Sequence, residues 1–420
     1  MLQHHRILSV YSSINMQSTK PVAIIGAGLS GLSLALALHN QNIPSVLYET
    51  QAAPLDIGGA IMLSPNALRI LDRLNFLAPV EPRGYKFEKS YFNSGDELVD
   101  VFEFGSAEKY GYPGLRVYRY ELINVLLNLV AKAGIHIEYG KKFDYIVSET
   151  EEGVTWQFAD GSEGSAPLLV GADGIHSRVR RYLYPDLVAK FTNMVGITAA
   201  VPTAQLQTSD YPLPATIMNR KHGAFVIAPQ QADGSEVLIG KQFRFTGPEP
   251  DREGWKKLTT DKKWAVDFLR QGHEDFPAIV ERATSSVREE NISVWPFYLL
   301  PKLDTWASEK HARVVILGDA AHAIPPTAGQ GVNQAFEDIY ILAGVLGKLG
   351  SESKAGAGER VKTALKNWQN GRQGRIDKVL DLNDQINQRR MPSEENIEFK
   401  PFDLAWLYAA DFDAMVAEYA

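Results

Sequence analysis

Three glycines near the start of the chain have the spacing of a phosphate-binding loop. Gly26, Gly28 and Gly31 follow the apolar run Val22–Ile25 in a G-x-G-x-x-G pattern. In such a loop the first glycine permits a tight turn, the second lets a pyrophosphate approach the backbone, and the third allows close packing of the next helix. Glu49 ends the following apolar run, where an acid accepts hydrogen bonds from a ribose diol. The pattern predicts dinucleotide binding but does not decide between NAD and FAD.

Two later apolar runs also lead to an acid beside a glycine, and a glycine pair follows the second. An acid at the end of a strand presents a carboxylate at the carboxyl edge of a sheet, where ligands of α/β folds bind. The glycine pair would let the backbone lie against a flat ring, and a helix beginning just after it would direct its positive N-terminus there. The residues concerned are Asp173, Gly174, Gly318, Asp319, Gly329, Gly331 and Val332.

The elements that must position these residues begin with a βαβ unit and then alternate less regularly. Apolar periodicity and turn residues define them. They are a strand at 22–25, a helix at 32–38, a strand at 45–48, a helix at 118–133, short strands over 135–170, a strand-rich stretch at 192–300 with a helix at 253–271, and a strand at 314–317.

The composition excludes several classes of site. The chain has 420 residues, a formal net charge of −7 and no cysteine. Its length exceeds what one hydrophobic core usually fills, so more than one lobe is expected. Without cysteine there is no disulfide framework, iron–sulfur cluster, thiolate nucleophile or thioether link to a cofactor. The negative charge argues against nucleic-acid binding, and no metal site is expected. An intracellular, cytoplasmic location is favoured.

The two ends of the chain are expected to lie outside the nucleotide lobe. Residues 1–20 have no signal-peptide pattern and are interpreted as a flexible leader. No stretch approaches the ~20 apolar residues that a membrane span requires. The apolar segment 402–420 carries several acids and predicts an amphipathic helix packed on the body. A peripheral membrane contact through this helix is the less favoured interpretation.

The motifs together resemble those of the single-component (group A) flavin-dependent monooxygenases, relatives of para-hydroxybenzoate hydroxylase. The resemblance covers about residues 20–350 and rests on the glycine loop, on Ala172–Arg180 as the family's D-G motif and on Gly318–Pro326 as its G-D motif. The run Gly329–Asn333 is similar to kynurenine and tetracycline-inactivating monooxygenases. The segment 58–67 looks more like salicylate-hydroxylase-like and fungal tailoring enzymes.

The resemblance implies that the cofactor is non-covalent FAD, and it assigns contacts to individual residues. Asp173 and Gly174 would contact the flavin pyrophosphate and a transiently bound NADPH or NADH. Asp319 would bind a ribityl hydroxyl, and Arg119, in an R-x-x-L motif, would contact the flavin. The run that ends at Asn333 would lie along the flavin ring.

The same resemblance implies a reaction with O2 and a small-molecule substrate. NAD(P)H would reduce FAD, and O2 would then form a C4a-hydroperoxyflavin that transfers one oxygen atom to the substrate. The carbonyl of Pro326 would help to orient that substrate. Because no second glycine loop follows a strand, a separate nicotinamide-binding domain is not expected.

The expected fold class is α/β, with a Rossmann-like FAD-binding domain, an inserted mixed β-sheet substrate domain and C-terminal helices. The discontinuous FAD-binding domain is assigned residues 21–85, 113–190 and 306–345. The substrate domain is assigned 86–112 and 191–305, and the helical region 346–420.

Substrate recognition is expected in the inserted sheet. Arg220 and His222 fall on a predicted strand at 217–228, where alternation places both on one face, and both are candidate catalytic residues. The favoured reaction is hydroxylation of an electron-rich aromatic or polyketide-type molecule. Two alternatives stay open: epoxidation or another oxygen insertion at an isoprenoid or indole double bond, and a flavin-binding reductase without oxygen transfer.

Overall fold

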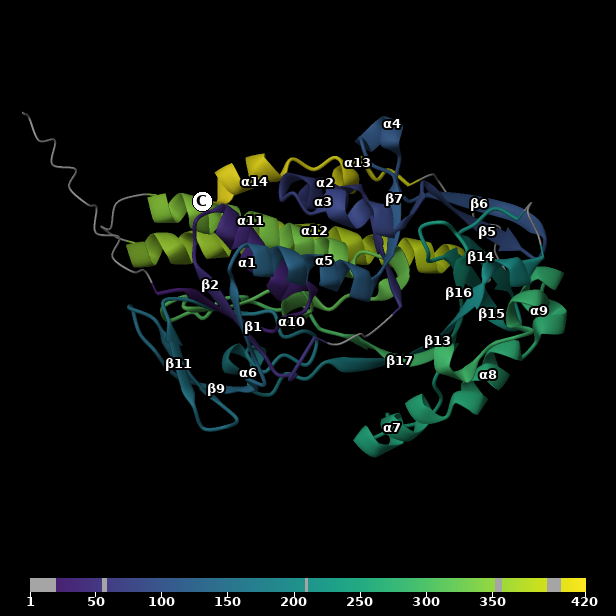
Figure 1. Cartoon of the computed structure of the whole chain (residues 1–420), viewed down its shortest axis with the longest axis horizontal. Coiled ribbons are helices and arrows are strands. Elements are labelled where there is room, and N and C mark those ends of the chain that lie inside the picture. The colour runs from purple at the N-terminus through teal and green to yellow at the C-terminus, as the bar shows by residue number, and fades with distance from the viewer. Residues whose placement is uncertain (1–19, 55–58, 208–210, 352–356, 391–401) are drawn as a thin grey trace, which may run out of the picture.

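The computed structural model describes residues 20–54, 59–207, 211–351, 357–390 and 402–420. The predicted leader at 1–20 lies outside the described residues except for Lys20. Figure 1 shows two lobes, with long helices over one sheet and a second large sheet beside them. The predicted α/β class, with a parallel nucleotide-type sheet, a mixed sheet and C-terminal helices, is confirmed.

A parallel five-stranded sheet forms the centre of the larger lobe. Its order is β18-β12-β1-β2-β8, and every residue of β1 is buried, as in parallel sheets covered on both faces. The bounds are β1 (Val22–Ile25), β2 (Ser45–Glu49), β8 (His136–Tyr139), β12 (Leu169–Gly171) and β18 (Val314–Ile316). Because β1 lies between β12 and β2, the loops after these strands meet at one edge.

Helices and a small sheet cover this central sheet. Helix α1 packs against α5 and α11, and the antiparallel sheet β11-β10-β9 lies away from these helices (Figure 1). The bounds are α1 (Leu29–Asn40), α5 (Arg119–Lys132), α11 (Gly331–Ser351), β9 (Phe143–Glu149), β10 (Val154–Phe158) and β11 (Glu163–Ala166). The helix predicted at 118–133 is thus confirmed.

The smaller lobe contains a seven-stranded mixed sheet of order β17-β13-β16-β15-β14-β5-β6. Its neighbours are antiparallel except β14 and β5, which pair in parallel and join two distant parts of the chain. The bounds are β5 (Lys89–Ser94), β6 (Glu97–Glu103), β13 (Lys190–Pro202), β14 (Ala215–Asn219), β15 (Gly223–Pro229), β16 (Glu236–Arg244) and β17 (Ile292–Leu299).

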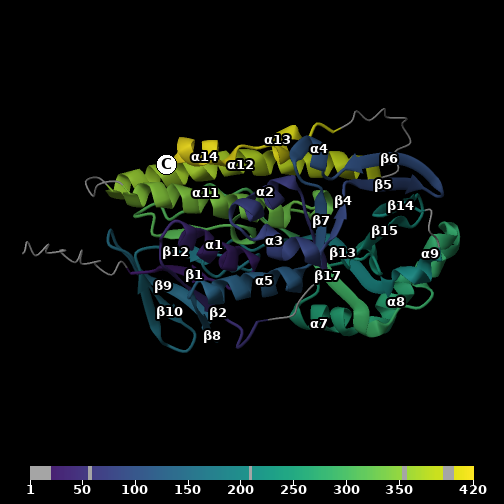
Figure 2. The ribbon, with the colours of Figure 1, turned by 45° about the horizontal axis from the view of Figure 1, so that its top comes forward.

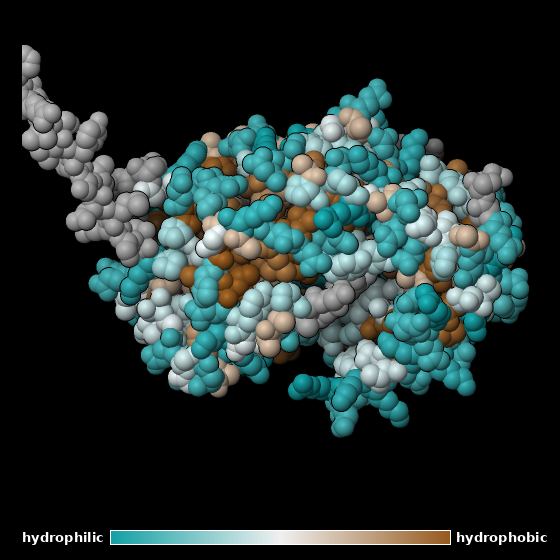
Figure 3. Space-filling view, viewed as in Figure 1, coloured by the Kyte–Doolittle hydropathy of each residue, from teal (hydrophilic) through white to brown (hydrophobic). Residues whose placement is uncertain are grey.

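The single helix predicted at 253–271 is wrong, because the chain forms two helices there. Helix α7 (Arg252–Thr260) ends before Asp261, whose side chain accepts a hydrogen bond from the backbone N–H of Trp264 and so caps α8 (Lys262–Arg270). Helix α9 (Ala278–Thr284) follows. Figure 3 shows mainly hydrophilic side chains over α7, which has no buried residue.

A third sheet joins the two lobes. It has the order β3-β7-β4 and is antiparallel, with bounds β3 (Ala60–Leu63), β4 (Tyr85–Phe87) and β7 (Gly114–Tyr118). Figure 2 shows β7 between the nucleotide-side helices and the seven-stranded sheet. Since β7 leads directly into α5, this small sheet links the substrate-side strands to the central sheet. Short helices complete this part: α2 (Pro65–Arg73), α3 (Leu77–Val80) and α4 (Ala107–Tyr110). Another short helix, α6 (Arg180–Leu183), follows β12 of the central sheet.

The C-terminal part is helical, with α11 and α12 (Ala357–Arg390) side by side in both ribbon views. The predicted boundary at 345 falls inside α11. The one amphipathic helix predicted over 402–420 is wrong: α13 (Ala405–Tyr408) and α14 (Phe412–Tyr419) are separate, because the Asp411 side chain caps α14. Within the described ranges, none of the helices combines the length and apolarity that a membrane crossing requires.

Candidate functional site

A cavity of about 530 Å³ lies at the carboxyl edge of the central sheet. Its walls come from the β1–α1 turn, the ends of β2 and β12, strand β3, and the start of α11. The predicted site residues that line it are Gly26, Gly28, Glu49, Arg119, Asp173, Gly174, Asp319, Pro326, Gly329, Gly331 and Val332. Motifs that are far apart in the sequence therefore meet around one space.

The first glycine loop combines close packing with an open side. A Cβ atom added to Gly31 would lie 1.9 Å from the carbonyl oxygen of Gly26, so only glycine fits there. A Cβ atom on Gly28 would meet nothing within 4 Å and would point into the open side of the loop. The loop thus holds α1 tightly against β1 while leaving its backbone accessible to a ligand at the N-terminus of α1.

Glu49 lies at the rim of the cavity and is held by the same loop. One of its carboxylate oxygens accepts a hydrogen bond of 2.8 Å from the backbone N–H of Ala27, and the other accepts one of 2.9 Å from that of Gln51. These bonds fix the direction of the carboxylate. Each carboxylate oxygen has more than one acceptor site, so Glu49 retains capacity for a ribose hydroxyl.

The carboxylate of Asp173 stabilises its own turn. It accepts hydrogen bonds from the Ser177 hydroxyl at 2.6 Å and from the Arg178 backbone N–H at 2.7 Å. Burial raises the pKa of Asp173, and these hydrogen bonds oppose that rise. Asp173 and Gly174 line the cavity, but the acid's main protein contacts are structural.

Arg180 connects the second motif to the third. Its guanidinium donates to the carbonyl of Ile175 at 2.6 Å and to that of Ala320 at 2.9 Å. Burial lowers the pKa of Arg180. Because Arg180 binds backbone carbonyls on both motifs, it fixes the distance between the Asp173 turn and α10 (Asp319–His322).

The third motif places Asp319 at the cavity and Gly318 behind it. Gly318 has a φ of +59°, and its backbone N–H donates to the Asp338 carboxylate at 2.9 Å. The His322 ring contacts the same carboxylate oxygen at 2.6 Å. Asp319 itself is exposed and lines the cavity. Gly318 and Gly31 therefore shape the site without lining it.

The place of Asn333 in the sequence suggested that it lines the cavity, but it does not. Its side chain is fully buried, accepts a hydrogen bond from the Ser64 backbone N–H at 3.0 Å, and donates to the carbonyls of Met62 and Gly329. These three bonds use its amide group within the protein. Asn333 thus fastens the Gly329 turn to β3 and positions the turn rather than facing the ligand.

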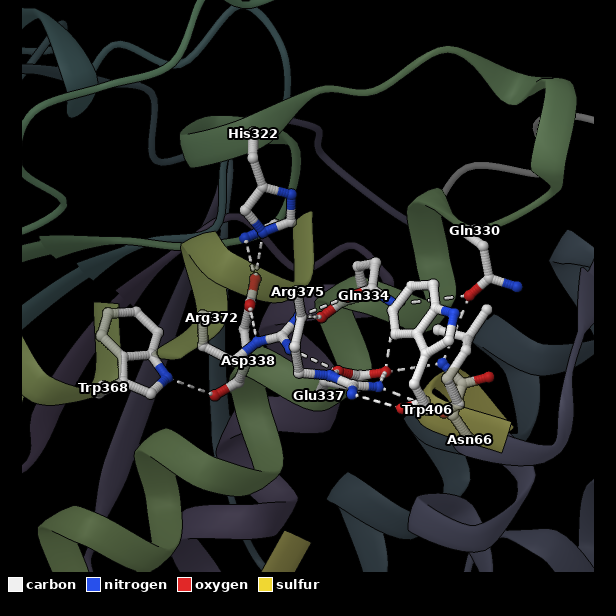
Figure 4. A network of polar contacts seen from close by, with 12 residues as sticks. Asn66, His322, Gln330, Gln334, Glu337, Asp338, Trp368, Arg372, Arg375 and Trp406 are labelled. Atoms are coloured by element: carbon white, nitrogen blue, oxygen red, sulfur yellow. Dashed lines mark hydrogen bonds and ion pairs between the residues drawn. The ribbon is translucent and has the colours of Figure 1, made fainter. Parts of the chain in front are cut away.

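A buried polar network behind the third motif was not predicted (Figure 4). Arg372 and Arg375 of α12 form ion pairs with Glu337, and Arg372 also binds Asp338 at 2.8 Å. The Asn66 amide donates to Glu337 at 2.7 Å, which brings α2 into the network. Arginines on a long polar helix look like surface residues in a sequence. The available signal was that Arg372 and Arg375, three residues apart, share one face of a helix and could pair with the adjacent acids Glu337 and Asp338.

The predicted strand that carried Arg220 and His222 is wrong. The chain makes a hairpin there: β14 ends at Asn219 and β15 begins at Gly223, with both residues in the turn. The Asn219 side chain accepts hydrogen bonds from the turn's backbone, including that of His222 at 3.1 Å. The His222 ring contacts Asp275 at 2.8 Å, and Arg220 is exposed. Neither lines the described cavity.

The cavity has the features that a bound dinucleotide needs. The N-termini of α1 and α11 both face it, and helix N-termini attract phosphate and other anionic groups. Added Cβ atoms on Gly28, Gly174 and Gly331 would meet no protein atom within 4 Å, so ligand atoms can approach the backbone at all three positions. The donor set suits the phosphates, ribose and ring of FAD.

The sequence matches the FAD binding domain family over residues 19–381. The chain belongs to this family. It is 28% identical to 3-amino-4-hydroxybenzoate 2-monooxygenase PtnB3 of Streptomyces platensis over 92% of this chain and 95% of that protein. It is also 28% identical to 6-hydroxynicotinate 3-monooxygenase of Bordetella bronchiseptica, over 81% of this chain and 86% of that protein.

The fold of this FAD-binding family member is similar to that of solved relatives. A salicylate hydroxylase substrate complex superposes with a TM-score of 0.76 at 23% identity, covering 96% of this chain and 98% of that one. The protein is an FAD-dependent monooxygenase of the aromatic hydroxylase type, as the resemblance to the group A flavin-dependent monooxygenases predicted.

Proposed function

We propose that this FAD-dependent monooxygenase transfers one atom of O2 to an electron-rich aromatic or polyketide-type small molecule, with NADPH or NADH as electron donor. The observation that carries the proposal is the meeting of three separate motifs around one cavity. The names of two relatives, a hydroxybenzoate and a hydroxynicotinate monooxygenase, support a hydroxylated aromatic substrate.

We further propose how the cavity residues divide the work of holding FAD. The loop from Gly26 to Gly31 binds the pyrophosphate, Glu49 the adenosine ribose and Asp319 a ribityl hydroxyl. Arg119, which is exposed at the start of α5, pairs with the phosphate charge. The helix that begins at Gly331 stabilises negative charge on the ring.

The substrate side of the cavity depends on the segment around Pro326. This residue begins a short 3-10 turn, η5 (Pro326–Ala328), and lines the cavity. The Ala328 backbone N–H donates to the Asn383 side chain at 2.7 Å, and the Thr327 hydroxyl donates to Asn387 at 3.1 Å. Helix α12 thereby fixes the turn. The Pro326 carbonyl accepts the Gly329 backbone N–H at 2.9 Å and keeps a second acceptor site with which it can orient a substrate.

When bound, FAD supplies hydride acceptance and O2 activation, and the protein supplies position and a dry surrounding. The apolar residues Ile61, Met62 and Ile324 line the cavity and limit the access of water to it. We assign residues 21–85, 113–190 and 306–345 to holding FAD, and 86–112 and 191–305 to the substrate. The five-stranded and seven-stranded sheets support this division.

The test is oxygen transfer from labelled O2. The purified protein is incubated with FAD, NADPH or NADH, ¹⁸O2 and a panel of hydroxylated aromatic acids, phenols, enols and alkenes. The expected result is substrate-stimulated NAD(P)H oxidation and a product that carries one ¹⁸O atom. Slow NAD(P)H oxidation with every compound, and no labelled product, would contradict the proposal.

A further inference from the structure

Arg116 is a buried cation in the wall of the cavity, and no sequence motif marked it. It lies in the middle of β7, paired with Met62 of β3 and Tyr85 of β4. Only 6% of its surface is exposed, yet it lines the cavity. Its backbone is therefore fixed by two neighbouring strands, and its side chain is enclosed beside the proposed ligand.

Among the described residues, no acidic side chain pairs with the Arg116 guanidinium to offset its burial. Its Nε has no hydrogen-bond acceptor, and none of the acidic side chains in the described ranges forms an ion pair with it. Burial lowers its pKa to about 10, so it stays charged at neutral pH. Arg180 and Arg372, by contrast, bind carbonyl or carboxylate oxygens. Since buried charges in proteins are normally paired, Arg116 needs an anionic ligand.

The position of Arg116 indicates which ligand that is. Tyr118 follows on the same face of β7, donates a hydrogen bond to Glu236 of β16, and accepts one of 2.9 Å from Gln230. This face of β7 thus meets the seven-stranded sheet. Met62, which pairs with Arg116 on the neighbouring strand, reaches the Gly329 turn. A Cβ atom added to Gly329 would lie 2.9 Å from the terminal methyl carbon of Met62. Arg116 lies between the substrate sheet and the turn assigned to the flavin ring.

We propose that Arg116 is the anion-binding group for the substrate and pairs with an acidic oxygen of an aromatic molecule, above all a carboxylate. This assignment rests on the proposed function. Arg119 and the N-terminus of α11 already supply positive charge to the cofactor, which leaves Arg116 for the second ligand. A guanidinium fits a carboxylate through two parallel hydrogen bonds, so it also sets the orientation of the ring.

The test compares aromatic acids with their neutral amides. The FAD-loaded protein and its Arg116→Gln and Arg116→Lys variants are titrated with benzoate, 4-hydroxybenzoate, benzamide and 4-hydroxybenzamide, and binding is read from the flavin absorbance spectrum. We expect the wild type to bind acids about 10-fold more tightly than amides or better, as one charge-assisted hydrogen-bond pair allows. Arg116→Gln removes that preference, Arg116→Lys keeps part of it, and FAD content stays unchanged.

Three outcomes would overturn the assignment. The first is an Arg116→Gln variant that still prefers acids. The second is loss of FAD or a shifted flavin potential with the acid preference intact, which would assign Arg116 to the flavin. The third is a wild type in which no acid of the series changes the flavin spectrum. Because the titration needs no turnover, a failure of oxygen transfer in the labelled-O2 test would be seen separately.

Two further variants distinguish ligand binding from a structural role. Arg83→Gln removes an exposed arginine that pairs with Glu121 outside the cavity, and it should leave both binding series unchanged. Arg116→Met replaces the buried charge by an apolar chain, so we expect the melting temperature of the FAD-free protein to rise. A fall would show that Arg116 serves the fold and would contradict the proposal.

Discussion

At the scale of single residues, the glycine loop contains positions that look alike in sequence and differ in their surroundings. Gly31 is enclosed by the Gly26 carbonyl, whereas Gly28 faces the cavity. From the spacing of the motif alone, both glycines would be assigned to ligand binding. Their separate roles, one in packing and one in ligand access, can be measured by the same substitution at each site.

Gly28→Ala should leave the fold intact and weaken FAD binding by about 10-fold or more, because the new methyl group occupies ligand space. Gly31→Ala should instead destabilise the protein by about 1–3 kcal/mol, since the methyl group meets the backbone. Chemical denaturation of the FAD-free forms and FAD titration measure the two effects. Equal stability losses in both variants would contradict this division.

Asp319→Ala should reduce FAD affinity by about 10-fold, the scale of one lost charge-assisted hydrogen bond. The side chain is exposed at the start of α10, so the melting temperature of the FAD-free protein should change little. Asp186→Ala, at an exposed position that does not line the cavity, is the matched control. Full FAD retention by Asp319→Ala would show that the third motif has another role.

At the scale of elements, the strands and helices with strong local signals were predictable. The run Val22–Ile25, its glycine loop and the helix after it have the apolar pattern and turn residues of a βαβ unit. Element breaks were less predictable. Asp261 stops α7 and caps α8, and a single polar residue within an amphipathic pattern does not reveal such a break.

The part of the site that the sequence did not predict depends on contacts between distant helices. Asn333 follows a glycine pair, and only the fold shows that Ser64 and Met62 use its amide. Arg372 lies beyond the segment that resembles the family motifs, so nothing local connects it to Asp338. Arg116 lacks a motif altogether. Its role depends on a burial that two neighbouring strands impose.

Arg372→Gln should destabilise the protein by about 3–5 kcal/mol, because it leaves buried carboxylates short of a charged partner. The loss should extend to FAD, since Asp338 also holds the Gly318 turn. Lys366→Gln, at an exposed position of the same helix, is the control. Urea denaturation of both variants is the measurement, and equal stability in the two would contradict the network's importance.

Acid should weaken the same network. Burial acts to raise the pKa of Glu337, but Arg375 and Arg372 outweigh this effect and hold the pKa below its ordinary value of 4.5. Burial acts in the same way on Asp338, whose pKa His322 and Arg372 hold below its ordinary value of 3.8. A lowered native pKa contributes stability that is complete above the ordinary value and is lost as pH falls through the native one. The free energy of unfolding should therefore fall below about pH 4.5, and less steeply in Arg372→Gln. The same pH dependence of the free energy of unfolding in the wild type and in Arg372→Gln would contradict this prediction.

At the scale of the whole molecule, cysteine is absent, so no thioether can tie the flavin to this protein. The purified protein should be yellow, and acid precipitation should release its FAD into the supernatant. Absorbance of the two fractions measures this. A flavin that stays with the precipitate, or a colourless protein that takes up no FAD, would contradict the proposed mode of binding.

The strand order of the central sheet also has a consequence for synthesis on the ribosome. Its middle strand, β1, is made first, whereas the edge strand β18 and the arginines of α12 that brace the Gly318 turn are made near the end. The outer edge of β12 in a nascent chain thus stays without its neighbour β18 until more than 300 residues have been translated. Long-range pairing of this kind slows folding. Flavin supply should therefore govern the yield of active protein after translation rather than during it.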